Sequence, residues 1–310
     1  MVLNSPVART LEVIGDRWAF LIIRDVYLGV RQFEELRKRT GAARGTLSSR
    51  LRTLVKSGIL YRNPYQRTPP RYEYRLTDKG FDLYPLVLAT WNWETKWGDG
   101  ENLPPELIHK TCGESLRPSY RCAHCHEEIT LLGVTYSPGR AVLSTKKIPP
   151  RFQRRSKSKE DNHPDVDRRF FHAVDVLGDR WTGLVVACTY FGITRFDDIV
   201  QSIGIATNIL SDRLKMLLNV GVVVRRPYQE KPVRYEYRLS EKGRELYPTA
   251  VAMHEWAKKW LMDGDDRPLK LRHRKCNKPL RPELVCNYCD KALKPGDVTF
   301  ERDLEQPRPA

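Results

Sequence analysis

One histidine and three cysteines occur with the same spacing at two places in this chain. The first set is His109, Cys112, Cys122 and Cys125, and the second set is His273, Cys276, Cys286 and Cys289. Zn²⁺ binds four nitrogen or sulfur ligands in a tetrahedron, and a Cys-x-x-Cys turn supplies two thiolates from one short loop. We therefore predict two structural zinc sites, each formed by the four residues of one copy. Neither site would leave a coordination position open for hydrolytic catalysis.

Two further histidines, His124 and His126, flank Cys125 and could act as ligands in place of His109. The second copy has no histidine beside Cys289, so the histidines that recur are the preferred ligands. The segments that carry these residues are too short to bury a good core, and a bound ion would supply folding free energy on the order of 10 kcal/mol. The remaining cysteine, Cys188, lies in the apolar stretch GLVVACTYFG and is expected to be a core thiol.

The overall composition limits the partners and the compartment. The 310-residue chain has 54 Lys and Arg against 38 Asp and Glu, which gives a net charge of +16. Such an excess of cations suits a polyanionic partner. Nucleic acid is preferred over a membrane because the sequence has no basic amphipathic helix, lipidation motif or apolar run of spanning length. The odd number of cysteines and the lack of an export signal argue against a disulfide framework. We expect a cytoplasmic protein that associates with the bacterial nucleoid.

The chain is a tandem duplication of one long unit. The motif GDRW at 15–18 returns at 178–181, and PYQRTPPRYEYRLTDKG at 64–80 returns as PYQEKPVRYEYRLSEKG at 227–243. Units of this length are whole domains, because solenoid repeats have periods of roughly 20–50 residues. The predicted order is a winged-helix domain (1–100), a zinc module (101–137), a basic flexible linker (138–168), a second winged-helix domain (169–264), a second zinc module (265–301) and a disordered tail (302–310).

Three helices open each unit and must position the residues that contact a partner. Apolar spacing predicts helices over 7–28, 31–39 and 43–57. The third helix would bury three leucines and present small, polar or cationic residues outward, which is typical of a recognition helix that enters the major groove of DNA. The predicted DNA contacts from these helices are Arg44, Ser48, Ser49 and Arg52 in the first copy and Thr207, Asn208, Ser211 and Lys215 in the second.

A basic hairpin follows the predicted recognition helix. Residues 59–65 and 71–76 are strand-like, and alternation in the second run would bury Tyr72, Tyr74 and Leu76 on one face. Glu73 is expected to pair with Arg71 or Arg75. Such a hairpin is a wing whose cations reach phosphates or the minor groove, and the predicted wing contacts are Arg67, Arg71, Lys231 and Arg234. A tryptophan-rich helix over 77–98 would then form a helical core or an interface between modules.

These motifs together resemble a known family. The segments VIGDRWAFLIIRDVYLGVRQFEELRKRTG, LSSRLRTLVKSGIL and PYQRTPPRYEYRLTDKG resemble the HxlR-type winged helix-turn-helix regulators, which are related to the MarR group, over 7–97 and again over 170–260. The resemblance implies an α+β fold and a DNA-binding regulator whose modules pair two-fold through their first and last helices. Many members have a redox-active cysteine before a proline near the first helix. This chain has Ser5-Pro6 there and Arg168-Arg169 in the second copy, so thiol sensing of that kind is not expected.

The predicted architecture is therefore two tandem winged-helix domains, each followed by a zinc-ribbon-like module. The leading functional hypothesis is a sequence-specific transcriptional regulator that reads an imperfect palindrome in double-stranded DNA. A repressor is favoured over an activator. Its two modules would form an intramolecular pseudo-dimer, with further homodimerisation and a small-molecule effector left open. Alternatives are a basal or architectural DNA-binding factor and a protein-interaction scaffold that uses the zinc modules. An enzyme is disfavoured because no nucleophile triad, phosphate-binding glycine loop or paired carboxylates occur at matching positions.

Overall fold

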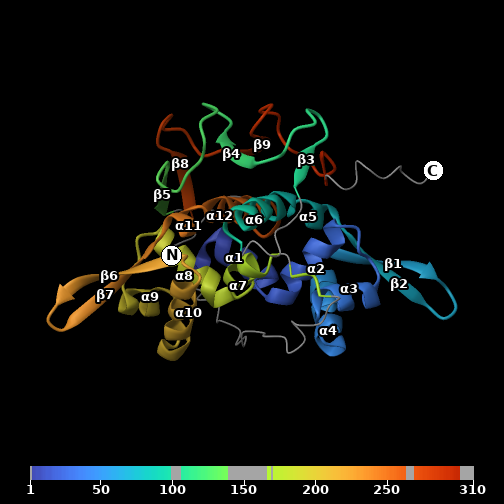
Figure 1. The fold of residues 1–310 in the computed structure, drawn as a ribbon, viewed down its shortest axis with the longest axis horizontal. Helices are drawn as coiled ribbons and strands as arrows, with labels where there is room; N and C mark the ends of the chain where they lie inside the picture. The colour runs from blue at the N-terminus through green and yellow to red at the C-terminus, as the bar shows by residue number, and fades with distance from the viewer. Residues whose placement is uncertain (1, 99–105, 139–165, 169, 263–268, 301–310) are drawn as a thin grey trace.

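A computed structural model describes residues 2–98, 106–138, 166–168, 170–262 and 269–300. It contains two winged-helix modules and one shared Cys-rich unit that lies across them (Figure 1). The first module comprises η1 (Val2–Asn4), α1 (Pro6–Ile14), α2 (Arg17–Tyr27), α3 (Phe33–Thr40), α4 (Arg44–Lys56), β1 (Leu60–Gln66), β2 (Arg71–Leu76), α5 (Asp78–Phe81) and α6 (Tyr84–Trp97). The second comprises α7 (Phe171–Leu177), α8 (Arg180–Tyr190), α9 (Phe196–Ile203), α10 (Thr207–Asn219), β6 (Val223–Glu230), β7 (Val233–Leu239), α11 (Glu241–Arg244) and α12 (Tyr247–Trp260).

The helix predicted over 7–28 is broken at Gly15 and Asp16, so this prediction was wrong in its continuity. Asp16 has extended backbone angles and its side chain accepts hydrogen bonds from the amides of Trp18 and Ala19. An aspartate in this position satisfies amide groups at the start of a new helix. Asp179 caps α8 in the same way, so the break recurs in both modules.

The tryptophan-rich helices form the interface between the two modules, one of the two alternatives expected from the sequence. Trp93 Nε1 of α6 donates to the Lys242 carbonyl at 2.9 Å, and Trp256 Nε1 of α12 donates to the Lys79 carbonyl at 2.8 Å. The indole Nε1 groups of Trp97 and Trp260 donate in the same way to the Glu245 and Asp82 carboxylates, at 2.8 and 2.7 Å respectively. Each last helix is therefore bonded to the other module's short helix after the wing, and α6 and α12 lie side by side (Figure 1).

The sequence predicted two separate Cys-rich modules, but in the structure the two Cys-rich segments form one shared unit. Their strands are β3 (Leu107–His109), β4 (Pro118–Cys122) and β5 (Val134–Pro138) from the first copy, and β8 (Leu269–His273), β9 (Pro282–Cys286) and β10 (Val298–Phe300) from the second. Every one of these strands pairs with a strand of the other copy: β3 with β10, β4 with β9 and β5 with β8, all antiparallel. Because every described strand of this unit has its strand partner in the other copy, with only isolated bridges inside each copy, the two segments build one unit together.

The predicted linker falls mostly outside the described residues, as does the predicted tail over 302–310. The described end of the linker, 166–168, packs on the first module. Val166 is buried, and the Asp167 carboxylate pairs with the Arg39 guanidinium at 2.7 Å. Arg39 in turn contacts the buried pair formed by Arg24 and Asp25. The residues directly before the second module are therefore anchored to the module that precedes them.

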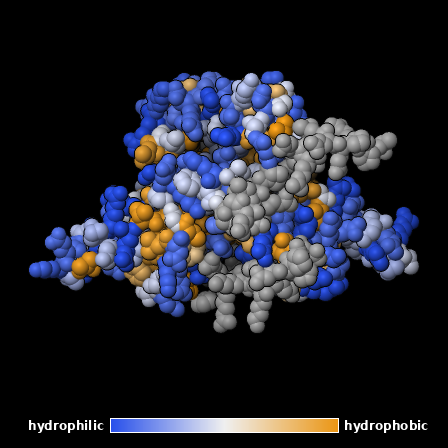
Figure 2. All heavy atoms as spheres, viewed as in Figure 1, coloured by the Kyte–Doolittle hydropathy of each residue, from blue (hydrophilic) through white to orange (hydrophobic). Residues whose placement is uncertain are grey.

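Hydrophilic side chains cover the two wings and most of the Cys-rich unit on the face shown in Figure 2, whereas hydrophobic side chains gather on the body between them. The core beneath is continuous: the helices, the wing bases and the Cys-rich strands all contribute buried apolar residues.

Candidate DNA-binding surface and metal centres

The helices α4 and α10 lie on the side of the molecule opposite the Cys-rich unit, and the two wings extend from its two ends (Figure 1). The inner face of α4 buries Leu47, Leu51 and Leu54 completely, as the apolar spacing predicted. The opposite face of α4, which includes Ser49 and Arg52, is exposed and can meet a partner. Helices and hairpins in this arrangement can place one recognition helix in each of two major-groove segments and one wing beside each.

Most of the predicted contact residues lie on the surface. In the helices Arg44, Ser49, Arg52, Thr207, Asn208, Ser211 and Lys215 are exposed, and Ser48 is half-buried. In the wings Arg67, Arg71, Lys231 and Arg234 are exposed. Arg44 is partly engaged already, because its guanidinium pairs with the Glu34 carboxylate at 2.9 Å and lies over the Phe33 ring. The structure brings these residues to accessible positions, and their contacts with DNA stay predictions.

The two recognition helices differ in charge. The α4 sequence RGTLSSRLRTLVK has four cations and no acid, whereas the α10 sequence TNILSDRLKMLLN has two cations and Asp212. One of the α10 cations, Arg213, is buried against Asp179. The first recognition helix therefore has more positive charge available for phosphates, and the second has amide groups that can bond to base edges.

An ion pair that sequence reasoning missed fixes each recognition helix. Arg50 Nε of α4 lies 3.2 Å from the Asp16 carboxylate, and Arg213 of α10 makes two bonds to the Asp179 carboxylate at 2.8 and 3.1 Å. Burial raises the pKa of Asp16, and Arg50 opposes that rise. The backbones of Asp16 and Asp179 also pair with each other as an isolated antiparallel bridge. Both recognition helices are thus tied to the point where the modules meet. The sequence did contain a signal for these ion pairs, because the GDRW motif is repeated and both recognition helices have an arginine at the matching position.

The wing of the first module agrees with the prediction except at Tyr72. Glu73 accepts hydrogen bonds from Arg75 and Asn63, at 2.6 and 2.7 Å, and these contacts lower the pKa of Glu73, with the Asn63 bond as the largest cause. Tyr74 and Leu76 are buried as expected, but Tyr72 is 44% exposed. Tyr72 lies in the distal half of the hairpin, where it pairs with Pro64 beyond the body of the module, so no second layer covers it.

The eight predicted metal ligands form two clusters, but each cluster combines residues of both copies. His109 and Cys112 lie with Cys286 and Cys289, and Cys122 and Cys125 lie with His273 and Cys276. The prediction of one site within each copy was therefore wrong in its grouping. The reason is the strand pairing, because β4 and β9 pair antiparallel and bring each Cys-x-x-Cys turn to the other copy's histidine. His124 and His126 are exposed and belong to neither cluster.

The distances within the clusters fit a tetrahedral metal ion. In the first cluster His109 Nδ1 lies 3.3 Å from Cys112 Sγ and 3.4 Å from Cys289 Sγ, and the Cys112 and Cys286 sulfurs are 3.9 Å apart. With Zn–S and Zn–N distances of about 2.3 and 2.0 Å, the edges of a tetrahedron are about 3.5–3.8 Å. The second cluster has matching distances of 3.2 and 3.6 Å from His273 Nδ1 to Cys125 and Cys276, and 3.9 Å between the Cys122 and Cys276 sulfurs.

Backbone amides favour the thiolate form of two of the cluster cysteines, whereas burial raises the pKa of Cys286. The Lys278 amide donates to Cys276 and lowers the pKa of that thiol to about 7, and the Lys291 amide lowers the pKa of Cys289. A thiolate is the form that binds metal. These clusters can hold metal ions with all four ligands supplied by the chain. Cys188 is separate from both and is fully buried in α8, and burial raises its pKa to about 12.

None of the helices in the described ranges has the length and apolar character that crossing a membrane requires.

Comparison with known proteins gives a consistent result. The family model described as HxlR-like helix-turn-helix matches residues 13–102 and again 176–265. The chain is 46% identical over 137 residues to an HTH-type transcriptional regulator of Mycobacterium bovis, across 44% of this chain and 87% of the relative. It is 39% identical over 101 residues to the HTH-type transcriptional regulator YvaP of Bacillus subtilis, across 32% of this chain and 94% of the relative. The crystal structure of the reduced transcriptional regulator YodB from B. subtilis is 35% identical, covers 31% of this chain and 95% of YodB, and has a TM-score of 0.28.

Proposed function

Because the chain belongs to the HxlR-like helix-turn-helix family, we propose that this DNA-binding transcriptional regulator reads two half-sites with the two winged-helix modules of one chain. The observation that carries the proposal is the exposure of two recognition helices on one side of a single polypeptide, each tied to the same module interface. Tethering makes binding of the second half-site intramolecular and raises its effective concentration.

The half-sites are proposed to form an imperfect palindrome. The modules are arranged about an approximate two-fold, as the matched tryptophan bonds indicate. Their outward residues differ, however: Gly45 corresponds to Asn208, and Ser49 corresponds to Asp212. An asparagine can bond an adenine edge through two hydrogen bonds, whereas a glycine cannot discriminate bases by side-chain contact.

The output is proposed to be repression, because a protein that covers both halves of one site blocks access to it. We propose that the protein acts in the cytoplasm at the nucleoid, does not bind a membrane and has no enzymatic activity. A basal or architectural role with low sequence preference is the competing proposal, and the experiment below separates the two.

Two structural Zn²⁺ ions are proposed to occupy the Cys/His clusters. The donor set of one histidine and three cysteines and the edge lengths near 3.5 Å support zinc over a hard cation such as Mg²⁺, which prefers oxygen ligands. His109, Cys112, Cys286 and Cys289 would hold one ion, and Cys122, Cys125, His273 and Cys276 would hold the other. Zinc would contribute folding free energy to the unit. With four protein ligands, neither ion would have an open coordination position.

The test is selection of binding sites from a random duplex library with the full zinc-loaded chain. We expect one bipartite motif whose two halves are related but not identical, bound by one chain per duplex in sedimentation. An enriched pool without any motif, at equal affinity, would support the architectural alternative. A motif with a single half would contradict reading by both modules.

A further inference from the structure

The segment that leads into each winged-helix module packs against helices of the other module. Residues 166–168 precede the second module and contact α2 and α3 of the first. Val166 is buried there, and the Asp167 amide donates to the Arg39 carbonyl at 2.9 Å. On the other side, η1 at the start of the first module packs against α8 and α9 of the second, and Val2 is 1% exposed. The two leading segments are therefore exchanged between the modules.

A buried cluster of two arginines and two aspartates holds the segment over 166–168. Asp25 of α2 is fully buried and lies between two guanidiniums, that of Arg24 at 2.9 Å and that of Arg39 at 3.3 Å. Asp167 supplies the second carboxylate, which pairs with Arg39 at 2.7 Å, and its carbonyl accepts from Arg24 at 3.2 Å. The Asp167 side chain is 6% exposed. Because buried charges must be paired, this cluster is balanced only with Asp167 in place.

The second module lacks the residues that would form a matching cluster. At positions offset by 163, the residues that correspond to Arg24, Asp25, Arg39 and Asp167 are Ala187, Cys188, Ser202 and Asn4. The charged contact is therefore specific to the first module.

The cluster lies directly before the first recognition helix. Arg39 is in the last turn of α3, and Gly41, with a left-handed backbone at φ 70°, ends that helix. The Thr40 hydroxyl donates to the Leu36 carbonyl at 2.7 Å and accepts from the Ala42 amide at 3.3 Å, so the turn that leads to α4 is bonded internally. Because this connection is short and bonded, a shift of the last turn of α3 moves the start of α4.

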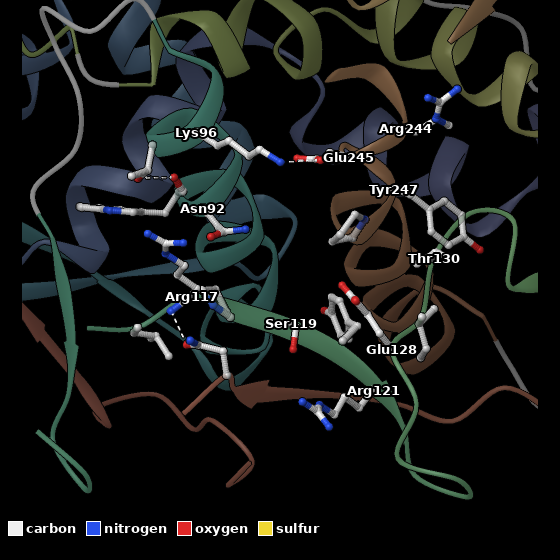
Figure 3. Close-up of a pocket in the computed structure, with 18 of the residues that line it drawn as sticks. Asn92, Lys96, Arg117, Ser119, Arg121, Glu128, Thr130, Arg244, Glu245 and Tyr247 are labelled. Carbon is white, nitrogen blue, oxygen red and sulfur yellow. Dashed lines mark hydrogen bonds and ion pairs between the residues drawn. The ribbon is translucent and has the colours of Figure 1, made fainter. Parts of the chain in front are cut away.

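Another ion pair joins the modules without contacting the helix-turn-helix. Lys96 of α6 pairs with Glu245 at 2.6 Å, in the wall of a cavity between the helices and the Cys-rich unit (Figure 3). Its loss would weaken a contact between the modules and leave the cluster around Asp167 intact. This pair therefore provides the comparison for a test of Asp167.

We propose that Asp167 is a positioning residue for the first recognition helix, so that reading of the first module's half-site depends on the segment that leads into the second module. This inference rests on the DNA-binding function proposed above. Without the Asp167 carboxylate, the guanidiniums of Arg24 and Arg39 share one carboxylate in a buried site, where like charges repel. The Arg39 side chain is 27% exposed, against 1% for Arg24, so Arg39 moves toward solvent and loosens the last turn of α3.

The first test measures amide hydrogen exchange of the zinc-loaded full chain. Asp167→Asn keeps the shape of the side chain and removes its charge. We expect exchange over 36–47 to become about tenfold faster, since local opening costs less when a buried contact is lost, and exchange over the matching segment 199–210 to stay the same. Glu245→Gln makes the same change of carboxylate to amide and should leave both segments as in the wild type. Unchanged exchange over 36–47 in Asp167→Asn would overturn the proposal.

The second test compares the selected duplex with one in which the first module's half-site is scrambled. That half-site is the one whose base preference Asn208→Ala leaves unchanged. Asp167→Asn should bind the selected duplex about tenfold more weakly than the wild type does, and the scrambled duplex equally well. Glu245→Gln should show no such difference between the two duplexes. An equal loss on both duplexes would show a general loss of binding and contradict the positioning role.

A double variant separates positioning from stability. Asp167→Asn with Arg39→Gln restores the balance of charge in the cluster without restoring the ion pair. It should therefore recover resistance to urea and still bind the selected duplex weakly. Recovery of wild-type affinity would mean that the stranded charge, and not the contact, controls α4, and would overturn the proposal. If the wild type binds no duplex, the proposed function fails, and the exchange measurement still decides whether Asp167 holds α3.

Discussion

Asn208 is the residue where the two recognition helices differ most in their capacity to read bases. It is the second residue of α10, exposed, and the helix has no side-chain capping bond at its start. A capping role would be the structural explanation for an asparagine there, and the observed geometry does not provide it. The exposed side chain is therefore available to a partner, and we predict that it meets a base edge, whereas Arg67 and Lys231 at the wing tips are predicted to meet phosphate or the minor groove.

Replacing Asn208 by Ala should relax base preference at one position and cost about 1–3 kcal/mol on the selected site, with the salt dependence unchanged. Replacing Arg67 or Lys231 by Ala should weaken binding to all sequences and reduce the salt slope by roughly one unit or less. Site selection and salt titration measure the two effects. Asn219→Ala, exposed at the other end of α10, is the control. An unchanged sequence logo for Asn208→Ala would show that this residue does not read DNA.

A buried histidine predicts a pH dependence of stability. His254 of α12 is 6% exposed, neither ring nitrogen has a hydrogen bond, and burial lowers its pKa to about 3. The unfolded chain binds a proton at this histidine near pH 6.5, while the folded chain does not, so stability falls as pH decreases from about 6.5 toward 3.

Between pH 7 and pH 5 this one group should cost the wild type up to about 2 kcal/mol of unfolding free energy. His254→Met removes this titration. The unfolding free energy of the wild type minus that of the variant, measured by urea titration, should therefore decrease by that amount from pH 7 to pH 5. The comparison cancels the acid sensitivity of the Cys/His clusters, which both proteins share. A difference that stays constant with pH would contradict the buried neutral state of His254.

At the scale of the elements, each recognition helix is held by one ion pair to a capping aspartate. The second pair is the more buried, with side-chain exposures of 10% and 7% for Arg213 and Asp179, against 26% and 14% for Arg50 and Asp16. Removing one partner of a buried pair leaves an uncompensated charge and costs about 3–5 kcal/mol. Partial exposure reduces that cost.

Asp179→Ser retains a capping hydroxyl and removes the ion pair, so it isolates the anchor from the cap. We expect a loss of about 3 kcal/mol in unfolding free energy, and a smaller loss for Asp16→Ser, both measured by denaturant titration. The double variant Asp179→Ser with Arg213→Met should recover part of the loss, because it removes the stranded charge. No recovery would mean that the cost comes from packing and not from the charge.

The sequence was informative where the determinants are local. The leucine spacing of 47, 51 and 54 placed α4 within a residue of its observed bounds, and alternation placed the wing strands. The apolar period runs through Gly15 and Asp16, so it could not show that a capping aspartate starts a second helix there. The metal ligands were identified by type and spacing, but their grouping depends on which strands pair, and β4 pairs with a strand that begins at Pro282. Spacing within one copy carries no information about that choice.

At the scale of the whole molecule, the shared Cys-rich unit joins the two copies at a second place besides the helical interface. Every described strand of the unit is paired with the other copy, and each cluster takes two ligands from each. With the proposed ions bound, each ion would bridge the two copies, so metal binding would be coupled to association of the two Cys-rich segments. Removing the proposed metal should unfold the unit, and the distance between the two recognition helices should then become less fixed.

Two paired substitutions distinguish shared clusters from separate ones. In the structure Cys112 and Cys289 belong to the same cluster, so Cys112→Ser with Cys289→Ser should destroy one site and leave about one zinc per chain. Cys112 and Cys125 belong to different clusters, so Cys112→Ser with Cys125→Ser should destroy both and leave almost none. Separate sites within each copy predict the reverse order, since Cys112 and Cys125 would then share one site. Elemental analysis of freshly reduced protein, with the wild type near two zinc ions per chain as reference, decides between them. Retention of one ion by the Cys112/Cys125 variant would contradict the shared arrangement.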